Sequence, residues 1–178
     1  ARKVQLMSRV SGATLREMKA TGQKIAMLTA YEFTMAQMMD QAGIDVLLVG
    51  DSLAMVVGGH ENTLPATMDI MVYHTDMVAR AVSRAMVVCD MPFMTYQVSA
   101  EKTMINAARI IQEGGAQAVK LEGGRAMAPT IRRIVRAGIP VMGHIGLTPQ
   151  SVYKFGGYKV QGSTPEEAQR LIESAKAL

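Results

Sequence analysis

The sequence has 178 residues, 49% of them apolar, which is long enough for one domain with a substantial core. No apolar run approaches the roughly 18 residues of a membrane-spanning helix, so we expect no membrane segment. The 19 basic and 15 acidic residues give a formal net charge of +4. The basic residues are scattered along the chain, which argues against nucleic acid as a partner.

The sequence also predicts the cellular compartment and the role of the single cysteine. The first residues lack the apolar block of a secretory signal, so we expect a cytoplasmic protein. The single cysteine, Cys89, lies inside an apolar run and is expected to be a small buried residue.

The first predicted element is a short helix at about residues 14–20, because Thr14 and Glu17 have the spacing of a capping box and Gly22 closes the helix. Residues 25–29 are expected to form a strand, and residues 34–42 a helix that stops at Gly43. Residues 46–49 form the next apolar run and predict a second strand.

The pattern then repeats. Helices are expected at about residues 69–83, 100–113 and 129–137, and strands at 86–90, 118–122 and 139–144. Ser99 is the predicted cap of the second of these helices, and Thr164 followed by Pro165 begins a last helix. Strands alternating with helices predict a parallel sheet with right-handed crossovers, either a barrel or an open doubly wound sheet. We treat residues 1–178 as a single domain, with the short helix at about residues 14–20 ahead of the alternation.

Three acids stand at the ends of three predicted strands: Asp51, Asp90 and Glu122. The carboxyl ends of parallel strands meet at one edge of the sheet, so these carboxylates are expected to lie close together. Oxygen ligands of this kind suit a hard cation, and we predict a Mg²⁺ site. Helix caps or ion pairs are the alternative roles, and the pattern alone favours neither reading.

Three further side chains belong to the predicted site. Lys120 lies two residues before Glu122, so both point to the same side of a strand, and its ammonium can pair with a substrate carboxylate or neutralise the acids. Ser52 can donate to the substrate or cap the next helix. His144 ends the fifth strand and is either a donor to the substrate or a structural residue.

Eight motifs together closely resemble the ketopantoate hydroxymethyltransferase family. They are Thr29-Ala30-Tyr31, Val49-Gly50-Asp51-Ser52, Gly59-His60-Glu61-Asn62-Thr63-Leu64-Pro65, Tyr73-His74-Thr75, Asp90-Met91-Pro92-Phe93-Met94, Val119-Lys120-Leu121-Glu122-Gly123-Gly124, Gly143-His144-Ile145-Gly146-Leu147-Thr148-Pro149-Gln150-Ser151 and Gly156-Gly157-Tyr158-Lys159-Val160-Gln161-Gly162. One departure is Glu32 after Tyr31, where the family commonly has Asp.

The resemblance implies a (β/α)8 barrel of the phosphoenolpyruvate/pyruvate superfamily. It further implies transfer of a hydroxymethyl group from 5,10-methylenetetrahydrofolate to 3-methyl-2-oxobutanoate, giving 2-dehydropantoate for pantothenate and coenzyme A synthesis. Mg²⁺ would polarise the 2-oxoacid and stabilise its enolate. By motif position, Asp51, Asp90 and Glu122 are the metal acids, and Asp51, Ser52, Asp90 and Lys120 contact the 2-oxoacid. A homo-oligomer, typically a decamer, is implied as well.

A closed barrel of this type has eight strands and about 250 residues, whereas only about the first five βα units are predicted here. In the family the general base is a Glu on a later strand, which we expect beyond Leu178 in a longer chain, so no catalytic base is assigned. A related Mg²⁺-dependent 2-oxoacid lyase or mutase is the alternative activity. An inactive fragment with a role in oligomer building is a third reading.

Overall fold

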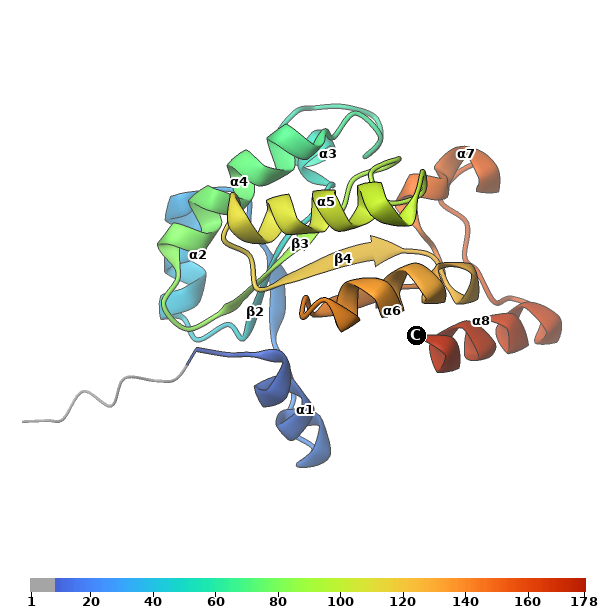
Figure 1. Ribbon diagram of the computed structural model, residues 1–178, viewed down its shortest axis with the longest axis horizontal. Coiled ribbons are helices and arrows are strands. Elements are labelled where there is room, and N and C mark those ends of the chain that lie inside the picture. The colour runs from blue at the N-terminus through green and yellow to red at the C-terminus, as the bar shows by residue number, and fades with distance from the viewer. Residues whose placement is uncertain (1–8) are drawn as a thin grey trace, which may run out of the picture.

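The computed structural model describes residues 9–178 and contains a parallel five-stranded sheet whose strands lie side by side in chain order (Figure 1). An order that never reverses is that of a barrel, whereas a doubly wound sheet reverses direction at a switch point. Of the two predicted architectures, the sheet therefore has the strand order of the barrel. The strands are β1 (Met27–Thr29), β2 (Val46–Val49), β3 (Met86–Asp90), β4 (Ala118–Glu122) and β5 (Val141–His144).

Helices follow the strands in alternation, and α2, α4, α5 and α6 cover one face of the sheet (Figure 1). The helices are α1 (Gly12–Ala20), α2 (Phe33–Gln41), α3 (Leu53–Val56), α4 (Met68–Ala81), α5 (Ala100–Gln112), α6 (Ala128–Arg136), α7 (Val152–Phe155) and α8 (Pro165–Ala177). Two short 3-10 turns, η1 (Arg125–Met127) and η2 (Pro149–Ser151), follow β4 and β5.

Side chains of the strands alternate between two apolar clusters, as the pleat of a strand requires. Val87 belongs to the larger cluster, between the sheet and the covering helices, together with Ile110 of α5. Its neighbour Met86 and Ala118 of β4 belong to a smaller cluster on the opposite face, against which Leu15 of α1 packs. This opposite face is the interior side of the barrel. The second and fourth residues after Ala118 share it, and both are predicted site residues.

Most of the helix caps predicted from the sequence are found in the structure. Ser99 Oγ accepts a hydrogen bond from the backbone of α5, and Thr164 caps α8 in a capping box, both as predicted. The predicted cap of α1 is wrong: Ser11 caps this helix and pairs with Thr14, so the helix begins at Gly12. Ser11 was missed because Thr14 and Glu17 offer the same spacing within the helix itself.

The strand boundaries and the short helices of the structure differ more from those predicted from the sequence. β1 and β5 begin at Met27 and Val141, later than predicted, because the first residues of each apolar run lie in the connection. The one-turn helices α3 and α7 were not predicted, since neither is long enough to show a helical period.

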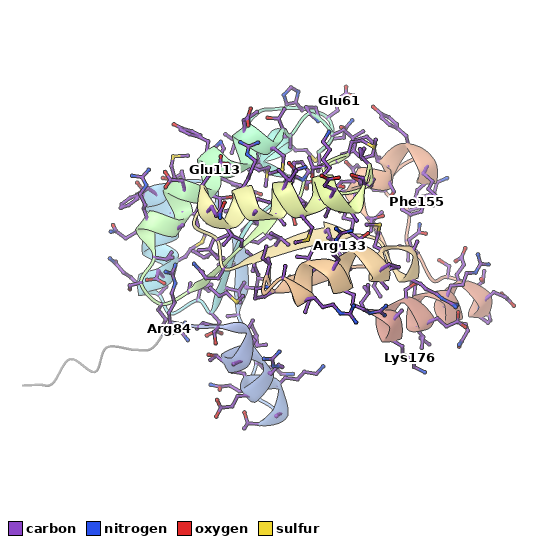
Figure 2. All side chains as sticks on the ribbon, in the orientation of Figure 1. Glu61, Arg84, Glu113, Arg133, Phe155 and Lys176 are labelled. Carbon is purple, nitrogen blue, oxygen red and sulfur yellow. The ribbon has the colours of Figure 1, made fainter. Side chains whose placement is uncertain are left out.

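Cys89 is fully buried, as expected, and burial raises the pKa of its thiol. Within residues 9–178 we find no helix that is both long and apolar enough to cross a membrane. Figure 2 orients the two edges of the sheet: Phe155 lies on the side toward which β4 points, and Arg84 lies on the opposite side.

Candidate active site

The predicted site residues lie at the carboxyl ends of neighbouring strands. Asp90, Glu122 and His144 are the last residues of β3, β4 and β5, and Asp51 follows β2. The parallel register sets Asp90 beside Lys120 and Glu122 beside His144. Strand-end residues of a barrel are where active sites are built, so this edge is the candidate active site.

Asp90 and Lys120 form a buried ion pair. Lys120 Nζ lies 2.6 Å from Asp90 Oδ1, and the side chains are only 13% and 6% exposed. The other oxygen, Asp90 Oδ2, accepts a hydrogen bond of 3.1 Å from the backbone N–H of Asp51. The sequence reading of Lys120 as an inward-facing partner of the acids is therefore confirmed for Asp90.

Glu122 and His144 also approach each other. His144 Nδ1 lies 3.2 Å from Glu122 Oε1, but the contact does not have hydrogen-bond geometry, and the buried Nδ1 has no hydrogen-bond partner among residues 9–178. Glu122 Oε2 instead accepts a hydrogen bond of 3.0 Å from the backbone N–H of Gln150. His144 Nδ1 is thus a buried polar atom without a hydrogen-bond partner, next to one of the acids.

Gln150 was not assigned a role from the sequence, yet it connects several strands. It lies in η2, is 6% exposed, and donates from Nε2 to Asp51 Oδ2 at 2.8 Å and to the carbonyl oxygen of Met91 at 3.0 Å. Its Oε1 accepts from the hydroxyl of Tyr96 at 2.6 Å. The motif that contains Gln150 was recognised, but nothing in its pattern says that the amide reaches back to the second strand.

Ser52 does not cap the following helix: its side chain makes no capping hydrogen bond to α3. Its Oγ lies 2.8 Å from the hydroxyl of Tyr31. Gly50 allows this arrangement, because a Cβ there would lie 2.7 Å from Ser52 Oγ and 3.5 Å from Asp90 Oδ2. Of the two roles left open for Ser52, capping is therefore excluded.

The remaining histidines lie elsewhere. His74 is on α4, as expected, and its Nδ1 donates to the carbonyl oxygen of Tyr31 at 2.5 Å. His60 and His74 both line a largely apolar cavity of about 480 Å³ between α3 and α4. The predicted site residues Asp51, Asp90 and Lys120 do not line this cavity.

Glu32, the departure from the family pattern, has a structural role. Its carboxylate caps α2 by accepting hydrogen bonds of 2.6 Å from the backbone N–H groups of Thr34 and Met35. The carboxylate of Glu32 therefore serves the start of a helix.

The electrostatics of the site are dominated by negative charge. Burial, together with the nearby charges of Asp90 and Glu122, raises the pKa of Asp51 to about 6. Burial also raises the pKa of Asp90, although Lys120 opposes that shift. Within residues 9–178, these three carboxylates have one ammonium, that of Lys120, paired with them, so the described cations do not balance the acids.

This imbalance suits a divalent cation. Within residues 9–178, no three His, Cys, Asp or Glu side chains already form a metal-binding cluster. Mg²⁺ usually takes only one or two carboxylates directly and keeps several waters, so a preformed three-ligand cluster is not required. The donor set, buried oxygen ligands with excess negative charge, fits Mg²⁺.

Comparison with known proteins gives a consistent picture. The family model described as "Ketopantoate hydroxymethyltransferase" matches residues 9–178. Proteins named 3-methyl-2-oxobutanoate hydroxymethyltransferase from Thermoanaerobacter sp. (strain X514) and Carboxydothermus hydrogenoformans are 58% and 57% identical over 170 and 172 residues. The matches cover 96% and 97% of this chain and 62% of each relative. The chain thus spans about 62% of the length of these relatives.

Solved structures show the same fold at low sequence identity. A 2,3-dimethylmalate lyase of the PEP mutase/isocitrate lyase superfamily has a TM-score of 0.67 at 17% identity, over 96% of this chain and 60% of that structure. A phosphonopyruvate hydrolase in complex with oxalate and Mg²⁺ has a TM-score of 0.64 at 14% identity, over 90% of this chain and 66% of that structure. The predicted fold, a parallel α/β barrel represented here by five strands in chain order, is confirmed by this likeness.

Proposed function

The chain belongs to the ketopantoate hydroxymethyltransferase family, and on that premise we propose that the protein carrying it transfers a hydroxymethyl group from 5,10-methylenetetrahydrofolate to 3-methyl-2-oxobutanoate, giving 2-dehydropantoate. The family match coincides with a buried cluster of three acids and a lysine at the strand ends, and this coincidence supports the proposal most strongly.

We place the metal and the 2-oxoacid at this cluster. Asp51, Asp90 and Glu122 are the residues that would hold Mg²⁺, directly or through water. A bound Mg²⁺ supplies Lewis-acid polarisation of the ketone, which acidifies the neighbouring C–H.

The protein's own side chains bind and orient the substrate in this proposal. Lys120 is held by Asp90 at 2.6 Å, so its ammonium has a fixed position from which to attract the carboxylate or the charge that develops on the ketone oxygen. Ser52 Oγ, oriented by Tyr31, is a donor to the substrate carboxylate. We also propose His144, which lies beside Glu122 at the end of β5, as a contact to the same ligand. We assign no general base within residues 9–178.

The cellular setting is also proposed from the resemblance. We expect a cytoplasmic homo-oligomer, typically a decamer, whose partners are the small 2-oxoacid and the folate. Light scattering on the full-length protein that carries this sequence tests the assembly, and a monomer at micromolar concentration would contradict it.

An assay of product formation tests the activity itself. The full-length protein, freed of metal and then given Mg²⁺, is expected to form 2-dehydropantoate and release tetrahydrofolate from the two proposed substrates. In heavy water without the folate, it should exchange the C3 proton of 3-methyl-2-oxobutanoate for deuterium. The absence of both product and exchange in folded, Mg²⁺-saturated protein would refute the proposal. Exchange without transfer would favour the related lyase or mutase activity.

A further inference from the structure

Gln150 has every hydrogen-bonding group of its side-chain amide occupied. Nε2 donates to Asp51 and to the carbonyl oxygen of Met91, and Oε1 accepts from Tyr96. A carbonyl oxygen can only accept, which fixes the end of the amide that faces Asp51. The side chain is therefore held in one orientation, inside the protein, by three different parts of the chain.

The same turn holds two of the three acids. The side chain of Gln150 binds Oδ2 of Asp51, and its backbone N–H binds Oε2 of Glu122 at 3.0 Å. Each carboxylate thus has one oxygen held by Gln150, and the other, Asp51 Oδ1 or Glu122 Oε1, accepts no hydrogen bond within residues 9–178, although Glu122 Oε1 lies 3.2 Å from His144 Nδ1. Tyr96 strengthens the link, because its hydroxyl also accepts from the backbone N–H of Glu122 at 3.2 Å.

We propose that Gln150 is a positioning residue for the cation site: it orients Asp51 and Glu122 so that their second oxygens converge on Mg²⁺. Outer-shell hydrogen bonds of this type fix metal-ligating carboxylates. The inference rests on the function proposed above and adds to it a residue that does not itself touch metal or substrate.

A second glutamine, Gln117, shows what a purely structural role looks like. Gln117 accepts from the backbone N–H of Val87 at 2.7 Å and donates to the carbonyl oxygen of Gly115 at 2.9 Å. All its partners are backbone groups, and it lies at the opposite edge of the sheet, just before β4. Gln150 differs in that one of its partners is a carboxylate of the candidate site.

The experiment compares Gln150→Met with Gln117→Met in the full-length protein. Each substitution keeps side-chain length and removes the amide. Mg²⁺ affinity is measured on metal-free protein by calorimetry, thermal unfolding is measured in parallel, and kcat and KM follow at saturating Mg²⁺. Tyr96→Phe keeps the ring and removes the 2.6 Å hydrogen bond to Oε1 of Gln150, while the longer one from Gln97 at 3.4 Å remains. It serves as a milder second variant if Gln150→Met fails to fold.

For Gln150→Met we expect Mg²⁺ to bind about 10-fold or more weakly, in line with other outer-shell substitutions. Gln117→Met should lose thermal stability and keep its Mg²⁺ affinity. Tyr96→Phe should weaken Mg²⁺ binding by a smaller factor, in the same direction. Added Mg²⁺ should restore part of the turnover of Gln150→Met, because the defect lies in holding the ion.

Two results would overturn the inference. One is unchanged Mg²⁺ affinity in folded Gln150→Met, or in Tyr96→Phe if the former does not fold. The other is an equal loss of affinity in Gln117→Met, which would make the effect one of general stability. Failure of the proposed function is distinguishable, since the unsubstituted protein would then form no product even when it binds Mg²⁺ normally.

Discussion

Removal of the Lys120 ammonium, by Lys120→Met, tests the buried ion pair at the centre of the site. Lys120 Nζ and Asp90 Oδ1 are 2.6 Å apart, and neither side chain is more than 13% exposed. The variant keeps most of the side-chain volume but leaves Asp90 as an unpaired buried charge. Breaking a buried pair from one side costs about 3–5 kcal/mol, so we expect the free energy of unfolding to fall by about 3 kcal/mol near neutral pH.

The pH dependence of that loss identifies its cause. Burial already raises the pKa of Asp90, and removal of Lys120 takes away the group that opposes the shift. A carboxyl whose pKa is higher in the folded than in the unfolded protein binds more protons when folded, so stability rises as the pH falls through the folded pKa. The deficit of Lys120→Met should therefore be smaller at about pH 5 than at about pH 7.

Urea denaturation at both pH values measures this effect, with Arg80→Met as the control. Arg80 and Asp76 form an ion pair of 3.0 Å on the surface, with side chains 63% and 44% exposed. Pairs of this kind contribute about 0–1 kcal/mol, so Arg80→Met should change stability little at either pH. A deficit for Lys120→Met below about 1 kcal/mol, or one independent of pH, would refute the reasoning.

Three further substitutions follow from the same structure. Asp51→Asn should stabilise the metal-free protein by about 2 kcal/mol near neutral pH, because the pKa of Asp51 is raised to about 6 and its ionised form is disfavoured. Calorimetry on the same variant should show that Mg²⁺ affinity is lost. A lower stability of the metal-free variant would contradict this prediction. Asp90→Asn should lower Mg²⁺ affinity and turnover together, and a rate with unchanged Mg²⁺ dependence would exclude Asp90 as a ligand. Ser99→Ala should cost about 1 kcal/mol in urea denaturation through the lost cap of α5, with unchanged kinetic constants; altered constants would show that this helix start influences the site.

The order of strands and helices could be read from the sequence because each strand is a short apolar run bounded by turn residues. The placement of Asp51, Asp90 and Glu122 at one edge followed from the same reading, since parallel strands share an edge for their carboxyl ends. The start of α1 was misplaced because two overlapping cap patterns compete, and only the structure shows that Ser11 binds the helix backbone.

The hydrogen bonds between the acids and their neighbours were not predictable in the same way. Gln150 and Asp51 are 99 residues apart, and no periodic pattern connects a 3-10 turn after the fifth strand with the end of the second. Tyr31 likewise contacts Ser52 through its hydroxyl, although a tyrosine after a strand has many ordinary roles. The sequence thus predicts which edge carries the site, and tertiary packing decides how each carboxylate is oriented.

Two aspartates at opposite ends of β2 show how packing distinguishes a structural acid from one that we propose as a metal ligand. Asp45 precedes the strand, and although burial opposes it, hydrogen bonds from the backbone N–H of Ala26 at 2.8 Å and from Arg84 lower the pKa of Asp45. Asp51 follows the strand and has a raised pKa, because burial and two neighbouring acids outweigh the hydrogen bond from Gln150. A carboxylate whose ionised form is already stabilised by hydrogen bonds and an ion pair gains little from a bound cation. The ionised form of Asp51 is only partly stabilised, so it costs the metal-free protein stability at neutral pH, and the cation that we propose for this site would relieve that cost.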